Sequence, residues 1–511
     1  MARRFREREL KFTPGEGFQV DTALERLDHL HSGEPSVRTL HATYFDTADL
    51  RLARAGASLR WRDDEGWMVK LPAGGGDGLL TRDELRLTGS PGDPPPEALD
   101  LVDAIVRGGR LTPVAQLVTV RNRVDLHDTH DHKVAELVDD EVSVLDGGRL
   151  TGRFRELEIE LTDDAPAELD RQLAEALRGA GAGRPDPVPK IVRALGPRAA
   201  DAPELPPPTP LDEASTPAEV LRAAICRSTR RLVTHDPGVR LGTDAEDVHQ
   251  ARVATRRLRS DLRTFRAVVD PEWDTALRDE LEWLGGLLGT VRDTDVLLER
   301  LEQRLVTLGA VDLDAGHELL AGLHATRDAA RAELLEAMRS PRYRALLDRL
   351  YAACRRVPGP PDAQDLDVEV VDVVRKPWRK LRRAADALTD ESPDPELHHV
   401  RILAKRCRYA AEAVAPALGS DAARFASRVA ALQDVLGEHQ DAVIAGQWLR
   451  EHASGDGARG ASEGENSGRS VAVAFVAGQL AMLEQAAAEA SRELWPGAWR
   501  AARARRLRRW M

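Results

Sequence analysis

The sequence has few cysteines, few aromatic residues and no long apolar run. Only Cys226, Cys354 and Cys407 occur among 511 residues, and aromatic residues make up 4% of the chain. Three cysteines this far apart argue against a disulfide framework or a zinc motif and indicate a reducing, cytoplasmic environment. Because no run of about 18 apolar residues is present, we expect no membrane-spanning segment. The N-terminal MARRFREREL has no apolar stretch after its basic residues, so we expect no secretory signal.

Length and charge narrow the class of protein further. A chain of 511 residues with 42% hydrophobic and 31% charged residues predicts a soluble globular protein of two or three domains. A net charge of −12 argues against a general nucleic-acid binder. Positive charge is nevertheless concentrated in two windows: His249 to Arg266 holds six arginines and one acid, and His398 to Tyr409 holds four basic residues and no acid. Such windows in an acidic protein indicate an anionic partner.

The chain changes character near residue 200. Residues 1–197 contain short segments of period-two alternation separated by Gly-rich turns, with two helical stretches, which predicts a mostly β domain. Residues 198–214 form a proline-rich linker. Residues 215–511 are rich in Ala, Leu, Arg and Glu and predict an all-α domain, with helix breaks near Asp236-Pro237, Pro271 and Pro341. The Gly/Ser-rich stretch Glu451 to Ser470 predicts a loop between two late helices.

The helical half contains an internal repeat. VHQARVATRRLRSDLRTF and LHHVRILAKRCRYAAEAV align His249 with His398. About 40 residues later, each copy carries a glycine followed four positions on by an aspartate, at Gly289 and Gly437. Two signatures in the same order, about 149 positions apart, indicate duplication.

Each copy places basic residues on one helix face. Positions i, i+3, i+7 and i+10 of a helix share a narrow arc, and these positions are His249, Arg252, Arg256 and Arg259 in one copy and His398, Arg401, Lys405 and Arg408 in the other. Arg257 and Arg406 lie on the flank. Like charges on adjacent turns repel, so the repeated pattern favours polyanion binding over a merely solvated helix face. For Asp293, Asp295 and Asp441, pairing with these arginines is favoured over metal binding.

These motifs resemble the CHAD domain, the conserved-histidine α-helical domain. The resemblance rests on HxxRxxxRRLR, LGxxRDxD, HxxRxxxKRxRY and LQDxLGxxxD and covers residues 215–511. It implies two pseudo-symmetric four-helix bundles with a basic cavity that binds inorganic polyphosphate. The binding residues that it implies are His249, Arg252, Arg256, Arg257, Arg259, Arg292, His398, Arg401, Lys405, Arg406, Arg408 and His439.

Charged residues alternate along the predicted strands of the N-terminal half. Glu7, Glu9 and Lys11 share one face of a strand, and Glu156, Glu158 and Glu160 share one face of another. Other strands carry basic faces, as in LRWR and TRDELRL. One interpretation of this pattern is an ordinary antiparallel sheet whose charged side faces solvent. A closed barrel with its charged side chains turned inward accounts for both signs, since carboxylates bind a hard divalent cation and basic residues bind phosphate oxygens.

The same residues resemble a CYTH domain, a triphosphate tunnel enzyme, over residues 1–197. The resemblance rests on ExExK, TYFDT, LRWR, VKLP, TRDE, ELEIEL and PKIVRAL. It implies an eight-stranded antiparallel tunnel that hydrolyses triphosphates with Mg²⁺ or Mn²⁺. The implied metal ligands are Glu7, Glu9, Glu156 and Glu158, with Asp139 or Asp140 and with Glu160. The implied phosphate clamp is Lys11, Arg60, Arg62, Lys70, Arg82, Arg121 and Lys190. Whether Arg121 or Arg123 faces the tunnel is left open, and Glu136 is a further candidate acid.

The sequence thus predicts an α+β multidomain protein that hydrolyses inorganic triphosphate and binds polyphosphate. The scarcity of aromatic residues disfavours a stacked base or thiamine, although thiamine triphosphate, nucleoside triphosphates and an ATP cyclase reaction remain open. A non-catalytic polyphosphate scaffold is the main alternative, and nucleic acid is a weaker one. We expect a cytoplasmic protein, without membrane partners, that can associate with polyphosphate granules. Self-association is left open.

Overall fold

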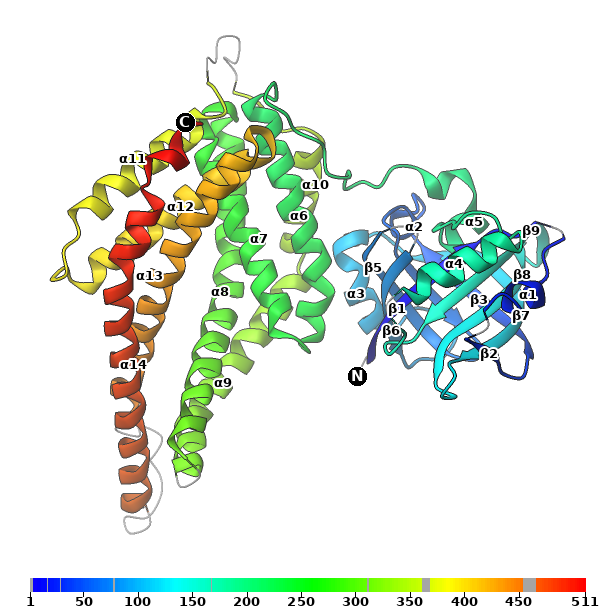
Figure 1. The fold of residues 1–511 in the computed structure, drawn as a ribbon, viewed down its shortest axis with the longest axis horizontal. Coiled ribbons are helices and arrows are strands. Elements are labelled where there is room, and N and C mark those ends of the chain that lie inside the picture. Colours follow the sequence, from blue (N-terminus) through cyan, green and yellow to red (C-terminus); the bar gives the residue numbers. More distant parts are fainter. Residues whose placement is uncertain are drawn as a thin grey trace. The chain divides into compact units, whose positions relative to one another are not determined.

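The computed structural model describes residues 3–15, 17–27, 29–76, 79–166, 168–309, 312–360, 368–453 and 466–511. The chain divides into two compact units, Met1–Pro206 and Pro207–Met511 (Figure 1). Ala199 and Leu205 are buried in the first unit, so the first residues of the proline-rich segment pack with it. The predicted loop Glu451 to Ser470 lies largely outside the described residues.

The first unit is a closed antiparallel β-barrel, as predicted. Its strands are β1 (Arg3–Phe12), β2 (His31–Ser32), β3 (Ser36–Asp46), β4 (Ser58–Arg62), β5 (Gly66–Gly76), β6 (Leu79–Leu87), β7 (Thr112–His127), β8 (Lys133–Asp146) and β9 (Arg149–Leu161). They follow the order β2-β7-β3-β4-β5-β6-β1-β9-β8, and a further pairing of β7 with β8 closes a ring of eight strands. The two-residue β2 pairs with the end of β7.

Alternation along the strands separates an apolar outside from a charged inside. On β9, Leu157 and Ile159 are fully buried in an apolar cluster outside the barrel, while Glu156 and Glu158 between them point the other way. That cluster is covered by α1 (Val20–Leu24) and α4 (Leu169–Gly179). The barrel is thus stabilised by burial on its outer face, and its interior remains available for charge.

Further helices complete the first unit. They are α2 (Arg51–Arg54), α3 (Pro96–Val106), α5 (Lys190–Leu195) and the 3₁₀ segment η1 (Pro197–Ala200). Ile191 of α5 packs against apolar side chains of β7 and β8, among them Leu117 and Val142, which share the inward face of their strands with Arg121 and Asp140. This packing holds the first residue of α5, Lys190, at the cavity described below.

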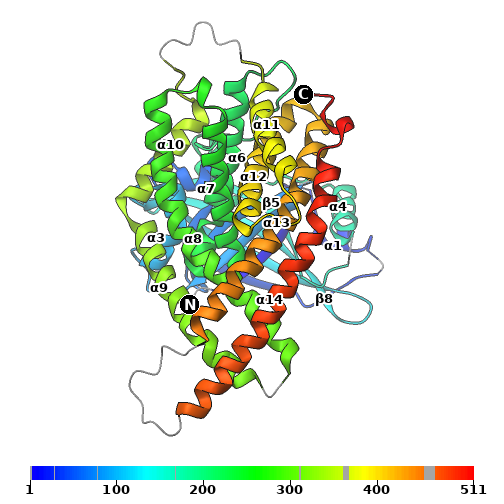
Figure 2. The same ribbon diagram turned by 90° about the vertical axis from the view of Figure 1, so that its left-hand side faces the viewer.

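The second unit is all-α, and its two halves lie side by side (Figure 2). The first half contains α6 (Pro217–Leu241), α7 (Ala245–Thr264), α8 (Pro271–Leu308), α9 (Leu313–Arg339) and α10 (Pro341–Arg355). The second contains α11 (Asp372–Ala387), α12 (Asp394–Leu418), α13 (Ser420–His452) and α14 (Asn466–Ala502). The 3₁₀ segments are η2 (Arg266–Val268) and η6 (Arg505–Arg508). In the first half, α10 begins at Pro341, where the side chain of Ser340 caps the helix by accepting a hydrogen bond from the backbone N–H of Tyr343.

The repeat predicted from the sequence is visible in the helix packing. The basic segments are α7 and α12, and the glycines that follow them lie on α8 and α13. In the first copy, a Cβ on Gly289 would lie 2.1 Å from Arg252 Nη1, and in the second, a Cβ on Gly437 would lie 3.5 Å from Arg401 Nε. An arginine of the preceding helix thus lies against the glycine in both copies, but only Gly289 leaves room that a Cβ would fill.

One helix boundary lies later than the sequence predicts. The break predicted near Asp236-Pro237 follows four residues later, since α6 continues through Pro237 to Leu241 and α7 begins at Ala245. A proline this close to a helix end disrupts little, and Asp236 accepts a hydrogen bond from Tyr343 there.

The helical segment Val471–Ala502 has the length and composition to cross a membrane, with a mean hydropathy of 1.5, although no continuous apolar run occurs. Its buried residues, including Val476 and Leu480, pack in a cluster with α8, α9 and α13, as in a bundle helix.

Candidate functional site: a charged tunnel and a basic helix face

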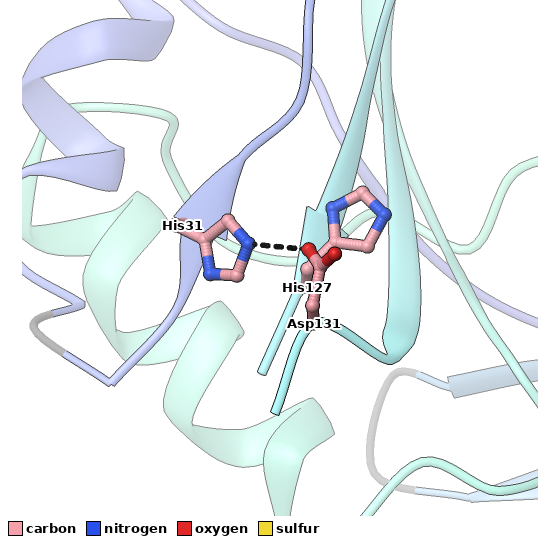
Figure 3. Close-up of side chains that lie close together, drawn as sticks. All are labelled: His31, His127 and Asp131. Atoms are coloured by element: carbon pink, nitrogen blue, oxygen red, sulfur yellow. Dashed lines mark hydrogen bonds and ion pairs between the residues drawn. The ribbon is translucent and has the colours of Figure 1, made fainter. Parts of the chain in front are cut away.

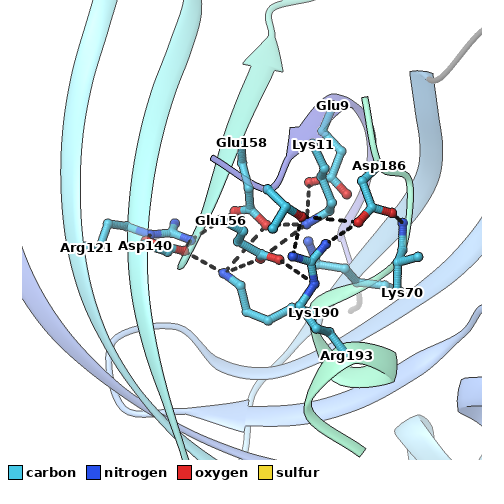
Figure 4. A network of polar contacts seen from close by, with 12 residues as sticks. Glu9, Lys11, Lys70, Arg121, Asp140, Glu156, Glu158, Asp186, Lys190 and Arg193 are labelled. Atoms are coloured by element: carbon cyan, nitrogen blue, oxygen red, sulfur yellow. Dashed lines mark hydrogen bonds and ion pairs between the residues drawn. The ribbon is translucent and has the colours of Figure 1, made fainter. Parts of the chain in front are cut away.

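The barrel encloses a cavity of about 340 Å³ lined mainly by charged side chains. The predicted residues that line it are Lys11, Arg60, Arg62, Lys70, Arg82, Arg121, Glu158, Glu160 and Lys190. Glu9, Asp140 and Glu156 lie behind this lining and are at most 1% exposed. The side chain of Glu7 is 7% exposed. The barrel therefore brings together the side chains that the sequence assigned to one site (Figure 4).

Carboxylates gather in two clusters on neighbouring strands. Glu7, Glu9 and Glu160 form one cluster, and Asp140, Glu156 and Glu158 form the other, each with ligand atoms within 4.8 Å of one another. Strand register explains both. Glu9 of β1 is directly opposite Glu160 of β9, and Asp140 of β8 is directly opposite Glu156 of β9.

Lys11 lies between the two clusters. Its Nζ is 3.4 Å from Glu9, is 3.7 Å from Glu156 and contacts Glu158 (Figure 4). The lysine is 1% exposed. These carboxylates raise its pKa well above the usual range, although burial alone would lower it. The ammonium group therefore stays charged and neutralises part of both clusters.

The remaining basic residues surround the carboxylates. Lys70 Nζ is 2.7 Å from Glu7, and Lys190 Nζ is 2.5 Å from Asp140. Arg121 makes two hydrogen bonds to Asp140, of 2.9 and 2.7 Å. Arg60 pairs with Glu65 at 3.1 Å. Both metal-binding candidates among the carboxylate clusters thus lie on β1, β8 and β9, and most basic residues of the tunnel come from the other strands and α5, where Glu65 and Glu84 also line the cavity.

Burial and nearby cations oppose one another in setting the carboxylate pKa values. Burial alone would raise the pKa of Glu7, but Lys70 and its neighbours bring it well below the usual range. Lys11 and its neighbours likewise lower the pKa of Glu158 against the effect of burial. Burial raises the pKa of Glu160 to about 7, and the charge of Glu7 adds to the effect. One cluster thus contains a carboxyl group that titrates near neutral pH.

Unsatisfied oxygens indicate that the clusters fit a divalent cation. Both carboxylate oxygens of Glu156 and Oε2 of Glu7 are buried and accept no hydrogen bond from the described residues. Lys190 Nζ lies 3.2 Å from Glu156 and Arg82 Nη2 lies 3.1 Å from Glu7, but a buried oxygen without a well-directed hydrogen bond still costs free energy. Carboxylate oxygens are ligands that suit both Mg²⁺ and Mn²⁺. The residues present therefore fit the metal that the sequence predicted.

The register resolves the two choices that the sequence left open. Asp140 faces the cavity, whereas Asp139 points outward and binds Arg155 at 2.8 and 2.7 Å. Arg121 and Arg123 both line the cavity, since they are two residues apart on β7. The alternative that Asp139 binds metal was therefore wrong.

Several residues of the tunnel were missed. Tyr44 and Arg38 line the cavity from β3, and Glu65 lines it from the β4–β5 turn. Arg193 of α5 approaches Glu156 to 3.9 Å. The alternation in SVRTLHATYFD places Arg38 and Tyr44 on one face of a strand and could have identified both. Glu65 lies in a turn, where no alternation indicates the direction of a side chain. Burial would raise the pKa of Tyr44, but Arg60 and other cations lower it overall.

In the second unit, the two basic stripes face one another. Arg257 of α7 pairs with Glu412 of α12 at 2.5 Å, and the guanidinium groups of Arg256 and Arg257 lie 5.6 and 5.1 Å from the ring centre of Tyr409 on α12. Burial lowers the pKa of Lys405 to about 7, and Arg256 adds to the effect. The packing of α7 on α12 thus gathers cations from both copies.

Many of these cationic groups have no anionic partner. Arg256, Arg292, Arg401, Lys405 and Arg406 make no ion pair within the described ranges, and Nε of the first three and Nδ1 of His398 are buried without a hydrogen bond. Other predicted residues do have partners: Arg252 pairs with Asp293 at 3.0 Å, Arg259 with Glu282 at 2.9 Å and Arg408 with Glu412 at 2.7 Å. Burial lowers the pKa of His249, and Arg292 adds to this effect.

His439 does not belong to this face. It is 1% exposed, and its Nε2 lies 3.2 Å from Asp394 at the start of α12. Gly437 and Asp441 lie on the side of α13 that approaches Arg401. His439 is two residues from each of them, which is a rotation of about 200° around the helix, so its side chain points to the opposite side. Its geometry indicates a packing role, in contrast to the binding role that the motif implied.

Comparisons with known proteins agree with this architecture. The model of the CYTH domain matches residues 6–193, and that of the CHAD domain matches residues 223–450. An uncharacterized protein of Mycobacterium tuberculosis (strain CDC 1551 / Oshkosh), MT2285, is 34% identical over 440 residues, which cover 81% of this chain and 82% of that protein. The chain is a member of the CYTH–CHAD family. A segment of 76 residues of the chain is 40% identical to a thiamine-triphosphatase of Macaca fascicularis, covering 15% of this chain and 31% of that protein.

The CHAD part is also similar to a solved structure. The crystal structure of the CHAD domain from the plant Ricinus communis covers 56% of the CYTH–CHAD chain and 95% of its own, with 28% identity and a TM-score of 0.43. The CYTH family includes triphosphatases, and its tunnel enzymes generally use divalent metals.

Proposed function

We propose that the barrel hydrolyses inorganic triphosphate with Mg²⁺ or Mn²⁺ and that the helical unit binds inorganic polyphosphate. The observation that carries the first part is the cavity inside the barrel, which combines two buried carboxylate clusters with many basic side chains. Water would attack a terminal phosphoryl group in line with the leaving diphosphate. A divalent cation held by the carboxylates would neutralise phosphate charge and polarise the attacking water.

The chain's own residues position the substrate. Arg121 and Lys190 lie against the Asp140 cluster, and Lys70 and Arg82 lie against Glu7. In the substrate-bound state, these cations would exchange part of their carboxylate contacts for phosphate oxygens, while a metal takes over the carboxylates. Fixed charges inside a closed barrel act in a medium that screens less than water does, which strengthens their effect on the transition state.

Steady-state phosphate release from triphosphate with Mg²⁺ or Mn²⁺ tests this proposal. Glu158→Gln removes a carboxylate of one cluster, and Glu141→Gln makes the same chemical change on the exposed side of β8. We expect the first variant to lose at least about a hundredfold in rate, as the loss of a preorganised charge does, and the second to resemble wild type. Equal, negligible release by all three proteins would favour the non-catalytic scaffold.

Inorganic triphosphate is the preferred substrate because the cavity offers little stacking surface. Tyr44 is the one aromatic residue among the described residues that line it. The short match to a thiamine-triphosphatase makes thiamine triphosphate the second candidate. A panel of inorganic, thiamine and nucleoside triphosphates, compared by kcat/KM, distinguishes them. A higher kcat/KM for an organic triphosphate would contradict the preference.

The polyphosphate proposal depends on the basic face formed by α7 and α12. The Nε atoms of Arg256, Arg292 and Arg401 are buried without a hydrogen bond, which is costly to the isolated protein, and a polyanion would bind these half-buried guanidinium groups. We expect His398→Ala/Arg401→Ala/Lys405→Ala to weaken binding of long-chain polyphosphate and to flatten its salt dependence, because fewer counterions are released. An unchanged salt slope would refute this assignment, and duplex DNA in the same assay tests the nucleic-acid alternative. We propose that this face retains the protein on cytoplasmic polyphosphate granules.

A further inference from the structure

Two histidines and an aspartate meet at the end of β7, away from the carboxylate clusters. Ligand atoms of His31, His127 and Asp131 lie within 4.8 Å of one another (Figure 3). A strand rises about 3.3 Å per residue, so His127 lies on the order of 20 Å along β7 from Arg121. This group is therefore separate from the carboxylates of the tunnel, and nothing in the triphosphatase proposal uses it.

The strand pairing sets the two imidazoles side by side. His31 of β2 is directly opposite His127 of β7, so both side chains leave the same face of the sheet. Their rings are 5.3 Å apart and nearly parallel, with an interplanar angle of 22°. Gly33 packs against the ring of His127, where an added Cβ would lie 3.4 Å from Cε1. Its backbone N–H donates to the carbonyl of Asp125 at 2.8 Å and continues the pairing of this short strand with β7.

The turn between β7 and β8 presents the aspartate. Asp131 adopts a left-handed conformation, with φ of 65°, which a short polar side chain tolerates better than most. Asp128 holds the turn, since one of its carboxylate oxygens accepts hydrogen bonds from the backbone N–H groups of His130 and His132 at 2.8 and 2.9 Å. In this turn, the Asp131 carboxylate reaches His31 Nε2 at 3.0 Å.

One donor atom of this group lacks a partner. Nδ1 of His127 is buried and has no hydrogen bond within the described part of the chain. A buried ring nitrogen without a partner costs free energy that a ligand bond would recover. Two imidazoles and one carboxylate match the ligand set of zinc sites that keep a position open for water. Mg²⁺ prefers oxygen ligands, so this group differs in chemistry from the carboxylate clusters.

We propose that His31, His127 and Asp131 form a binding site for Zn²⁺ or a similar transition-metal ion, independent of the tunnel metal. The bound ion would join β2 to the β7–β8 turn and fix the segment before β3 to the barrel. Because β2 is only two residues long, such a cross-link would contribute much of the attachment of this segment.

Calorimetric titration of the untagged, metal-free chain with Zn²⁺, in excess Mg²⁺ to occupy the tunnel, tests the site. We expect His31→Ala/His127→Ala to bind one Zn²⁺ fewer than wild type, and Asp131→Asn to bind it at least about tenfold more weakly, as is typical when metal coordination is disturbed. His317→Ala is the matched control, because His317 is exposed on α9, in the second unit. It should bind Zn²⁺ as wild type does. Equal zinc stoichiometry and affinity in wild type and the double variant would overturn the proposal.

Two measurements separate this proposal from the hydrolase. Glu7→Gln should retain the zinc site even though hydrolysis is lost, and the double variant should retain Mg²⁺-dependent phosphate release. Zinc should also raise the Tm of wild type and of Glu7→Gln, but not that of the double variant, because it binds only a folded site. A zinc-induced rise in Tm that persists in the double variant would assign the effect to another site and contradict the proposal.

Discussion

Lys405 provides a quantitative test of the basic face. This lysine of α12 is partly buried beside Arg256 and Arg401, and burial together with these charges lowers its pKa from 10.5 to about 7. The unfolded chain therefore binds a proton between pH 7 and 10.5 that the folded chain gives up. Stability contributed by this position rises with pH across that window and is lowest below pH 7. We expect Lys405→Met to stabilise the protein at neutral pH and below.

The size of the effect follows from the pKa difference. At about 1.36 kcal/mol for each pKa unit, lowering the pKa from 10.5 to about 7 corresponds to on the order of 5 kcal/mol. Water and counterions reach the partly exposed side chain and screen its repulsion. We therefore expect a gain of about 1–2 kcal/mol in the free energy of unfolding at pH 6.5, which disappears above pH 10.

Urea denaturation followed by far-ultraviolet circular dichroism measures this gain, because the helical unit dominates that signal. Lys380→Met, at an exposed lysine of α11, is the matched control and should change stability by less than about 0.5 kcal/mol. The stabilised Lys405→Met should also bind long-chain polyphosphate more weakly than wild type. If it unfolds at the same or a lower urea concentration than wild type at pH 6.5, the repulsion inferred from the structure is absent.

Three further predictions concern the tunnel and the repeat. Asp140→Asn should slow triphosphate hydrolysis by about a hundredfold or more, whereas the same change at the outward-facing Asp139 should leave kcat nearly unaffected; similar kcat values would contradict the register. Because burial raises the pKa of Glu160 from 4.5 to about 7, the metal-free barrel should lose stability as pH rises through that window, and Glu160→Gln should remove the loss in thermal unfolding with EDTA. Gly289→Ala should displace the arginine that lies across it and weaken polyphosphate binding, while Gly437→Ala, whose Cβ would make only an ordinary contact of 3.5 Å, should not; equal binding by both variants would contradict this difference.

The barrel and its two walls could be predicted because alternation acts over single strands. Glu7 and Lys11 share one face of a strand, and in a closed barrel that face points either inward or outward. The apolar residues between the charges pack against helices outside the barrel, so the charged face points inward. The helical repeat could be predicted for a similar reason, since His249 and His398 start the same spacing of basic residues on two helices.

Details that depend on register or on packing between helices could not be predicted. Asp139 and Asp140 are equivalent in sequence until the pairing of β8 with β9 is known. His439 fits the repeated motif, but the neighbouring Asp394 and the interior of the bundle decide its direction. The zinc candidate was missed because His31 and His127 are distant in sequence and meet only through a two-residue strand.

The pairing of β1 with β9 has a consequence for how activity appears during synthesis. Each carboxylate cluster includes residues of β9, so neither exists in a chain that stops before Arg149. Contacts between the first and last strands of a barrel form late, because the intervening chain must close a long loop. A growing polypeptide would therefore carry its acidic residues as ordinary solvated side chains until the final strand emerges, and metal affinity would arise in one step with completion of the fold.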